Sequence, residues 1–189
     1  MKVWIEKSIV KKRIDRKTGD LSLGKALWSP TKDKGGNDIY STMRDVKAGD
    51  VVLHLTDNKA ITGVSIASSA FREGQGAEGT DWYGPAYIIS LKDYVEINPP
   101  FDRKLLLQES NRGKLDQIRS KNKVFYNSKL SLNQGAYLTE APHELVSLIG
   151  ELYLSEYDKQ IPYLDQVVSI KKTNSIPTFY KIIKSAERE

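Results

Sequence analysis

Two tryptophans stand beside turn-forming residues instead of inside apolar runs. Trp28 is followed by Ser29 and Pro30, and Trp82 precedes Tyr83 in a glycine-rich stretch. An indole ring is a large flat surface, and two such rings facing one cavity can stack on both sides of a planar ligand such as a nucleobase. The pattern therefore predicts binding by stacking, with no chemical step performed on the ligand.

Residue patterns typical of catalysis are scarce. The sequence has no Gly-x-Ser-x-Gly elbow and no phosphate-binding Gly-Lys-Ser/Thr loop. His54 and His143 lack metal-ligand spacing, and His54 is expected to be a core or sheet residue. Asp45 and Asp50 belong to a run of aspartates that could serve a two-metal nuclease, but their positions favour solvent-facing helix and turn sites. We expect a binding domain without catalytic residues, metal or cofactor; a nuclease acting alone is the alternative.

Composition limits the compartment and the partner. The chain has 189 residues, no cysteine, a net charge of +5 and a pI near 9.2. Its start lacks the apolar core of a signal peptide, and no window approaches the roughly 18 apolar residues of a membrane span. We therefore expect a cytoplasmic protein that contacts no membrane. The basic excess is consistent with a polyanionic partner.

Basic residues crowd one short stretch near the N-terminus and a later polar connection. The first comprises Lys11, Lys12, Arg13, Arg16 and Lys17; the second comprises Arg112, Lys114, Arg119, Lys121 and Lys123. Either stretch could supply sequence-independent contacts to phosphates, and either could equally be a solvated surface.

Hydrophobic periodicity predicts the elements that must position the two tryptophans. Alternating or continuous apolar runs predict strands over 2–7, 51–55, 60–67, 87–91 and 94–97. Gly63 would permit a bulge or a close backbone approach. Between 72 and 84 we expect a long flexible loop, and Pro99-Pro100 should break the strand pattern. A short helix is expected over 103–110.

A further helix is predicted to contain Leu145, Leu148, Ile149 and Leu152, which stand at helical spacing, with Thr139 as its cap and Pro142 in its first turn. Trp4 is expected in the core. The whole predicts an α+β fold with a small curved or barrel-like sheet and peripheral helices. Residues 171–177 look like a linker, and 178–184 could begin another domain.

The order of these motifs resembles the YTH and EVE branch of the PUA-like superfamily. Ser22-Leu-Gly-Lys-Ala-Leu-Trp28-Ser29 is similar to the YTH segment that supplies one wall of an N6-methyladenine cage, and Asp81-Trp82 stands where a second cage tryptophan occurs. Val46-Lys-Ala-Gly-Asp50 and Ile61-Thr-Gly-Val-Ser65 resemble the EVE signature. The combined pattern is similar to N-terminal DNA-recognition domains of McrB-type modification-dependent restriction proteins.

The resemblance implies a role for each site residue. Trp28 and Trp82 would be cage walls, Tyr83 a third wall, and the Ser29 backbone and Asp20 would meet the edge of the base. Contacts to phosphate would come from Lys11, Lys12, Arg13, Lys32 and Lys34.

The resemblance also implies a function and a domain organisation. Residues 1–160 would form the modified-base-binding domain, and 161–189 a C-terminal segment and linker. The expected partner is methylated double-stranded DNA. The expected modified base is N6-methyladenine, which would be flipped out of the duplex and into the cage. An AAA+ GTPase domain would follow in the full-length protein, with a separate nuclease subunit. A methylated-RNA reader and a 5-methylcytosine DNA reader are the alternatives.

Overall fold

The computed structural model describes residues 1–167, so the expected linker at 171–177 and the segment 178–184 lie outside the described residues. Over these residues the chain forms seven strands, six of them before residue 103 and the seventh after residue 121. They are β1 (Val3–Ser8), β2 (Ala26–Pro30), β3 (Val51–Thr56), β4 (Ala60–Ala67), β5 (Arg72–Gln75), β6 (Pro85–Asp102) and β7 (Leu138–Ala141). The helices are α1 (Arg103–Leu106), α2 (Arg112–Lys121) and α3 (His143–Tyr157), with 3-10 turns η1 (Ile14–Arg16), η2 (Ser41–Asp45) and η3 (Glu109–Asn111).

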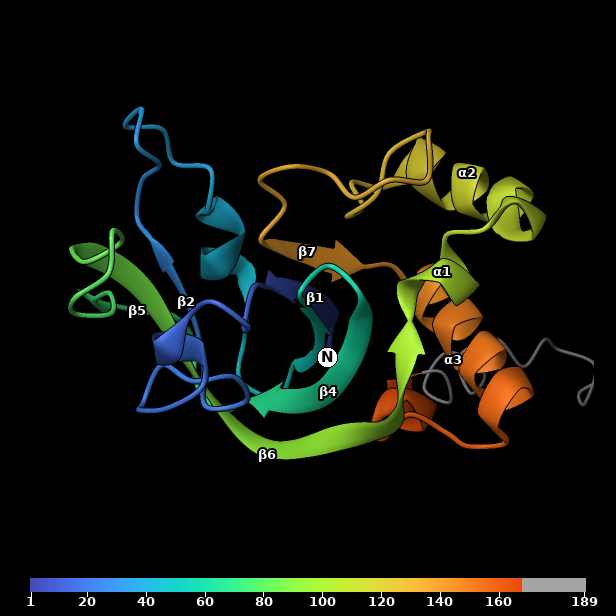
Figure 1. Cartoon of the computed structure of the whole chain (residues 1–189). Helices are drawn as coiled ribbons and strands as arrows, with labels where there is room; N and C mark the ends of the chain where they lie inside the picture. The colour runs from blue at the N-terminus through green and yellow to red at the C-terminus, as the bar shows by residue number, and fades with distance from the viewer. Residues whose placement is uncertain (168–189) are drawn as a thin grey trace, which may run out of the picture.

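The strands form one mixed sheet in the order β2-β6-β4-β3-β1-β7, with β5 also paired to β6. β1 and β3 are parallel, and the other pairs are antiparallel. Figure 1 shows that the sheet curls, with the helices gathered at one end and β2 and β5 at the other. The predicted α+β class with a small curved sheet and peripheral helices is therefore confirmed.

The long strand β6 carries the curl. Its first part pairs with β2 and β5, and its second part pairs with β4. We predicted two separate strands and a break at Pro99-Pro100, but β6 is one strand that continues through both prolines. It can do so because its pairing with β4 skips several β6 residues between the pairs Gly63↔Glu96 and Ile61↔Phe101. Both prolines fall in the resulting bulge, where no ladder N–H is required. Gly63 allows the close approach expected of it, since the ring of Tyr94 occupies the space that a Cβ would need.

Several local predictions need correction. Residues 112–121 form α2 where a connection was expected, because Leu115 and Ile118 bury one face of an otherwise polar segment. The expected flexible loop begins with strand β5, which pairs along β6. Thr139 lies in β7, paired with Ile5, and the residue that precedes α3 as its N-cap is Pro142.

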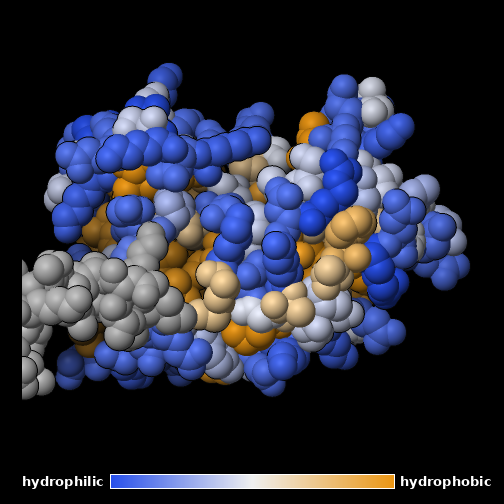
Figure 2. Space-filling view, turned by 180° about the vertical axis from the view of Figure 1, so that it is seen from behind, coloured by the Kyte–Doolittle hydropathy of each residue, from blue (hydrophilic) through white to orange (hydrophobic). Residues whose placement is uncertain are grey.

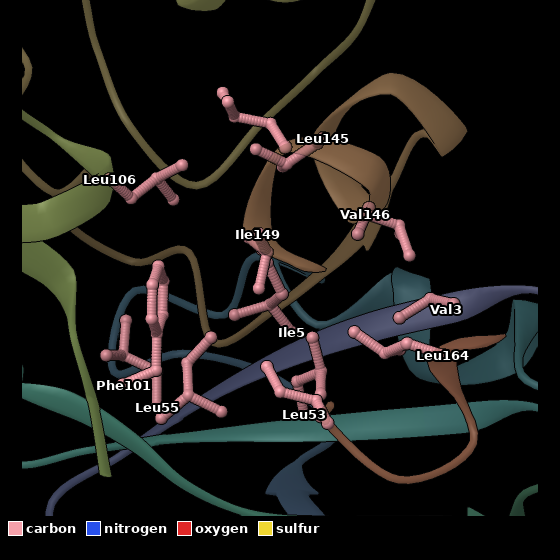
Figure 3. Packing of buried hydrophobic residues seen from close by; sticks show 14 of the residues in the cluster. Val3, Ile5, Leu53, Leu55, Phe101, Leu106, Leu145, Val146, Ile149 and Leu164 are labelled. Atoms are coloured by element: carbon pink, nitrogen blue, oxygen red, sulfur yellow. The ribbon is translucent and has the colours of Figure 1, made fainter. Parts of the chain in front are cut away.

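The two faces of the sheet carry different apolar clusters. On one face, Ile5 and Leu53 pack against Leu145 and Ile149 of α3 (Figure 3). On the other face, Trp4 packs with Leu27, Val52 and Ile89 and is only 1% exposed, which confirms it as a core residue. Strand alternation sends neighbouring residues to opposite faces, so β1 and β3 contribute to both clusters.

Asp50 contradicts the expectation of a solvent-facing position. It is buried, and its carboxylate accepts hydrogen bonds from the Trp4 Nε1–H at 3.0 Å and the Lys2 N–H at 2.8 Å. The tryptophan that lies inside the core thus has its polar atom satisfied by the turn before β3.

Hydrophilic residues cover most of the face seen in Figure 2, and hydrophobic surface shows between them. Within residues 1–167, no helix has the length and apolar character needed to cross a membrane.

Substitutions of two leucines in α3 test how much the packing of this helix stabilises the fold. Leu145 is fully buried and Leu154 is 45% exposed on the same helix. Leu145→Ala should lower the free energy of unfolding by about 2–5 kcal/mol, because it leaves a cavity in the main core. Leu154→Ala should cost less than about 0.5 kcal/mol. Urea denaturation of both variants measures the difference; equal losses would contradict the packing described.

Candidate nucleic-acid interface

A cleft of about 300 Å³ opens beside β2, where the N-terminal segment, the loop after β5 and the segment before β7 meet. Its volume lies at the low end of the range of about 300–1,000 Å³ typical of small-molecule sites. The cleft is lined by Lys7, Ile9, Arg13, Trp28, Ser29, Pro30, Tyr40, Trp82, Gly135 and Tyr137. Trp28 and Trp82, singled out from the sequence, therefore line the same cleft.

Trp28 is a residue of the fold and of the cleft at the same time. Its backbone pairs with Ile88 in the β2–β6 ladder, and its side chain is 3% exposed in a small cluster with Ala77 and Ala86. Gly76 permits this packing, because a Cβ there would lie 2.8 Å from the indole Cζ3. The ring therefore has little free surface in the unliganded fold, although it borders the cleft.

Trp82 lies on the loop between β5 and β6 and is partly buried against the same cluster. The base of the loop is closed by the Gly76 N–H, which donates to the Gly84 carbonyl at 2.9 Å. The Nζ atom of Lys34 lies 5.5 Å from the centroid of the Trp82 ring. A loop tryptophan is thus held near the sheet without becoming part of it.

Glycines of this loop have the Gly-x-Gly-x-x-Gly spacing at positions 74, 76 and 79, a pattern that the sequence analysis did not single out. That pattern indicates a dinucleotide-binding turn only where a helix follows the strand. Here residues 76–84 are loop and lead into β6. The glycines instead allow close packing against Trp28 and turns with positive φ, as at Gly79.

Arg13 covers the ring of Trp28. Its guanidinium carbon lies 4.9 Å from the ring centroid. Two hydrogen bonds to Asp15 hold it there, from Nη2 to Oδ2 at 2.6 Å and from Nε to Oδ1 at 3.2 Å. A residue predicted to contact phosphate thus lies on the aromatic wall of the cleft.

Beneath the cleft lies a buried polar network centred on Glu6. Oε1 of Glu6 accepts from Arg16 Nη2 at 2.6 Å and from the Tyr137 hydroxyl at 3.0 Å, and Oε2 lies 2.6 Å from His54 Nδ1. The far side of the His54 ring is 2.7 Å from Ser65 Oγ. His54 is therefore a structural residue of the sheet, as expected.

Tyr137 connects that network to the cleft. Its hydroxyl accepts the backbone N–H of Trp28 at 3.0 Å while donating to Glu6. Burial, with the Glu6 carboxylate beside it, raises the pKa of Tyr137 well above its usual value and keeps the hydroxyl protonated. The position of the Trp28 backbone is thus tied to a buried carboxylate.

Sequence reasoning missed this network. Arg16 was counted with the basic surface stretch, yet it is 2% exposed and points inward. The signal for Glu6 was its place in a strand, on the same face as the buried Trp4. Tyr137 carried no local signal, because its partners lie at the other end of the chain.

Two polar atoms at the cleft have no hydrogen-bond partner within the described part of the chain. They are Nε1 of Trp28 and Oγ of Ser29, and both are buried. Buried donors without partners cost free energy, and such atoms are often completed by water or a ligand.

The other predicted contacts lie away from the lining. Tyr83 is 59% exposed, and Asp20, Lys11, Lys12 and Lys32 are also exposed. None of them is among the residues that form the cleft wall.

A second groove of about 790 Å³ adjoins the cleft and was not predicted. The two share Tyr40, Gly135 and Tyr137. Tyr40 and Tyr137 meet edge to face, with ring centroids 6.2 Å apart, at the border.

The cleft is lined by groups that can stack on a ligand or form hydrogen bonds to it. Aromatic rings, cations and hydroxyls line it, and of the residues described no carboxylate or imidazole does. Over residues 1–167 there is also no cluster of three or more His, Asp or Glu side chains that could hold a metal. The arrangement suits the stacking of a planar ligand.

No protein-family model and no curated protein sequence matches the chain. Among solved structures, the fold is similar to the N-terminal domain of Staphylothermus marinus McrB, with 13% identity, 79% of this chain and 93% of that chain covered, and a TM-score of 0.46. A protein from Agrobacterium tumefaciens is 14% identical over 85% of this chain and 99% of that chain, with a TM-score of 0.45. A Rhodopseudomonas palustris protein is 10% identical over 80% and 92%, with a TM-score of 0.43.

The buried carboxylate makes a prediction about acid stability. Burial alone would raise the pKa of Glu6, but Arg16, His54 and Tyr137 together hold it below its usual value near 4.5. Ionised Glu6 therefore stabilises the fold at pH values above about 4.5, the usual pKa of a glutamate. This contribution to the free energy of unfolding is lost as the pH falls through the lower pKa of Glu6 in the folded state. The free energy of unfolding, measured in urea between pH 7 and pH 3, should fall in the acid range.

Glu6→Gln should lose about 3–5 kcal/mol at pH 7, because it leaves the Arg16 charge buried and unpaired. Its stability should also depend less on acid pH than that of the wild type. Glu73→Gln, at an exposed position on β5, is the matched control and should change neither quantity. A wild-type acid profile without a decline would contradict the assigned role of Glu6.

Proposed function

We propose that this chain is a DNA-binding module that recognises a methylated base, N6-methyladenine, by taking it out of the duplex and into the cleft between Trp28 and Trp82. In this proposal it is the cytoplasmic targeting domain of a modification-dependent restriction system, without catalytic residues of its own. An AAA+ GTPase domain would follow it in the full-length protein, and a separate nuclease subunit would cut the DNA.

The observation that supports the proposal is that Trp28 and Trp82 line the same cleft. They come from a sheet strand and from a loop that is distant in sequence, and they line one cleft of about 300 Å³. Ser29, whose backbone was expected at the edge of the base, lines it too, and its buried hydroxyl has no hydrogen-bond partner among residues 1–167. A site with stacking surfaces and free polar atoms at its edge has the means to hold a base and to read it.

The energetics of base flipping fit two aromatic walls. Extruding a base costs on the order of a few kcal/mol. Stacking on an aromatic side chain contributes about 1–3 kcal/mol per contact. One buried methyl group adds on the order of 1 kcal/mol, so a preference of about ten- to a hundredfold for the methylated base is expected.

Base entry requires Arg13 to move. Because its guanidinium covers the Trp28 ring, a base that stacks there must push it aside. The two hydrogen bonds to Asp15 keep the displaced guanidinium at the cleft. The exposed Lys11, Lys12 and Lys32, together with Lys34, then provide contacts to phosphate that do not depend on sequence.

Substitution of each wall tests the proposal. Trp28→Ala and Trp82→Ala should each abolish most of the preference for a duplex with one N6-methyladenine over its unmethylated twin, because each removes a stacking surface. Tyr83→Ala is the matched control: it alters an exposed aromatic residue beside Trp82 and should leave the preference unchanged. Fluorescence anisotropy at fixed salt measures the affinities, and circular dichroism confirms that Trp28→Ala still folds.

Equal affinity of the wild-type chain for both duplexes would refute methyl recognition. Tighter binding to methylated single-stranded RNA, or to a duplex with 5-methylcytosine, would replace N6-methyladenine in DNA by that ligand.

A further inference from the structure

Both indole faces of the cleft already have a cation beside them. The Arg13 guanidinium carbon is 4.9 Å from the Trp28 ring centroid, and Lys34 Nζ is 5.5 Å from the Trp82 ring centroid. Both distances lie within the roughly 6 Å at which a cation is attracted to an aromatic face. The electrostatic attraction that these rings offer to positive charge is therefore satisfied within the chain.

The charges that line the cleft have one sign. Lys7 and Arg13 are lining residues, and no carboxylate of the described chain joins them. Two acidic groups that contact lining residues are already paired. Asp15 is paired with Arg13, and Glu6 lies under Tyr137 with Arg16 and His54 around it.

This arrangement is opposite to that of a cage for a cationic ligand. Aromatic cages for quaternary ammonium or methylated lysine offer open ring faces to the positive charge. Here a cationic ligand that displaced Arg13 from Trp28 would only exchange one cation for another. It would also lie beside the displaced guanidinium, which Asp15 retains, and such like-charge contacts are strongly unfavourable.

We infer that the cleft selects its ligand by charge: it takes an uncharged planar base and rejects a positively charged one, with Arg13 and Lys34 as the specificity-determining residues. The inference rests on the proposed function, in that the cleft is taken to receive a base. It adds the class of base, because methylation that leaves the ring neutral is accepted and methylation that makes the ring cationic is excluded.

Three duplexes that differ at one adenine test the inference with the full 189-residue chain. The adenine is unmodified, N6-methylated and neutral, or 1-methylated and cationic at neutral pH. Methylation at ring N1 also breaks the base pair, which makes that base easier to extrude. Ease of flipping alone therefore favours the cationic base, and the inference predicts the reverse: affinity about tenfold or more lower than for the N6-methylated duplex.

Variants of Arg13 and Lys34 show whether the cationic base is excluded by charge repulsion or by steric hindrance. Arg13→Gln and Lys34→Gln each remove one cation from an indole face, and each should reduce the ratio of the two affinities by about threefold or more by improving relative binding of the cationic base. Lys32→Gln removes an exposed charge from the same loop as Lys34. This control should weaken all three duplexes alike and leave the ratio unchanged.

The outcomes distinguish the inference from the function on which it rests. Wild-type binding of the neutral and cationic methylated bases with equal affinity, both above unmodified DNA, overturns the charge selection and leaves methyl recognition intact. A ratio that stays high in both Arg13→Gln and Lys34→Gln also overturns it, because exclusion is then steric. Equal binding of all three duplexes overturns the proposed function and the inference together. Rejection of the cationic base without any preference for N6-methyladenine supports charge selection and overturns methyl recognition.

Discussion

Glu6 is a carboxylate with no access to solvent, and its charge has to be balanced inside the fold. Arg16, His54 and Tyr137 do this from three different parts of the chain. A buried charge of this kind is costly unless its partners stay in place, so the requirement fixes the turn at 14–16, the centre of β3 and the segment before β7 relative to β1. The cleft is built from those segments and their neighbours. Through Tyr137, the same network also holds the backbone of Trp28.

The cleft consequently has one wall in the sheet and another in a loop. Trp28 is fixed by strand pairing, by close packing on Gly76 and by Tyr137. Trp82 is carried by a loop whose ends are joined by a backbone hydrogen bond. Arg13 lies over the ring that a ligand would need, held by Asp15. A preformed wall reduces the ordering cost of binding, and the contact that has to give way is the stacking of the Arg13 guanidinium on the Trp28 ring.

Patterns confined to one segment were predictable from the sequence. The alternation in β1, the apolar run of β3, its partner β4 and the helical spacing of α3 all predict the elements observed. Elements that depend on distant partners were not predictable in this way. β7 is four residues long and is defined by its pairing with β1, and α2 buries only Leu115 and Ile118 among many polar residues.

The same difference between local patterns and distant partners explains why only some residues of the candidate site were predicted. Tryptophans beside Ser-Pro and inside a glycine-rich loop are visible as local departures from core patterning, and both line the cleft. Tyr83 was predicted as a third wall, yet it is 59% exposed and does not line the cleft, because the exposure of a loop residue depends on the path of the loop. Arg13 and Arg16 stand three positions apart in one basic stretch, and only the tertiary structure reveals that one covers an indole ring and the other neutralises Glu6.

The central claim is that one extruded base is held between the Trp28 and Trp82 rings. A crystal structure of the chain bound to a duplex with a single N6-methyladenine tests it most directly. The account predicts the methylated base outside the helical stack, between the two indoles, with the Arg13 guanidinium shifted off Trp28. A methylated base still stacked in the duplex, or one seated in the groove beyond Tyr40 and Tyr137 with Arg13 unmoved, would contradict it.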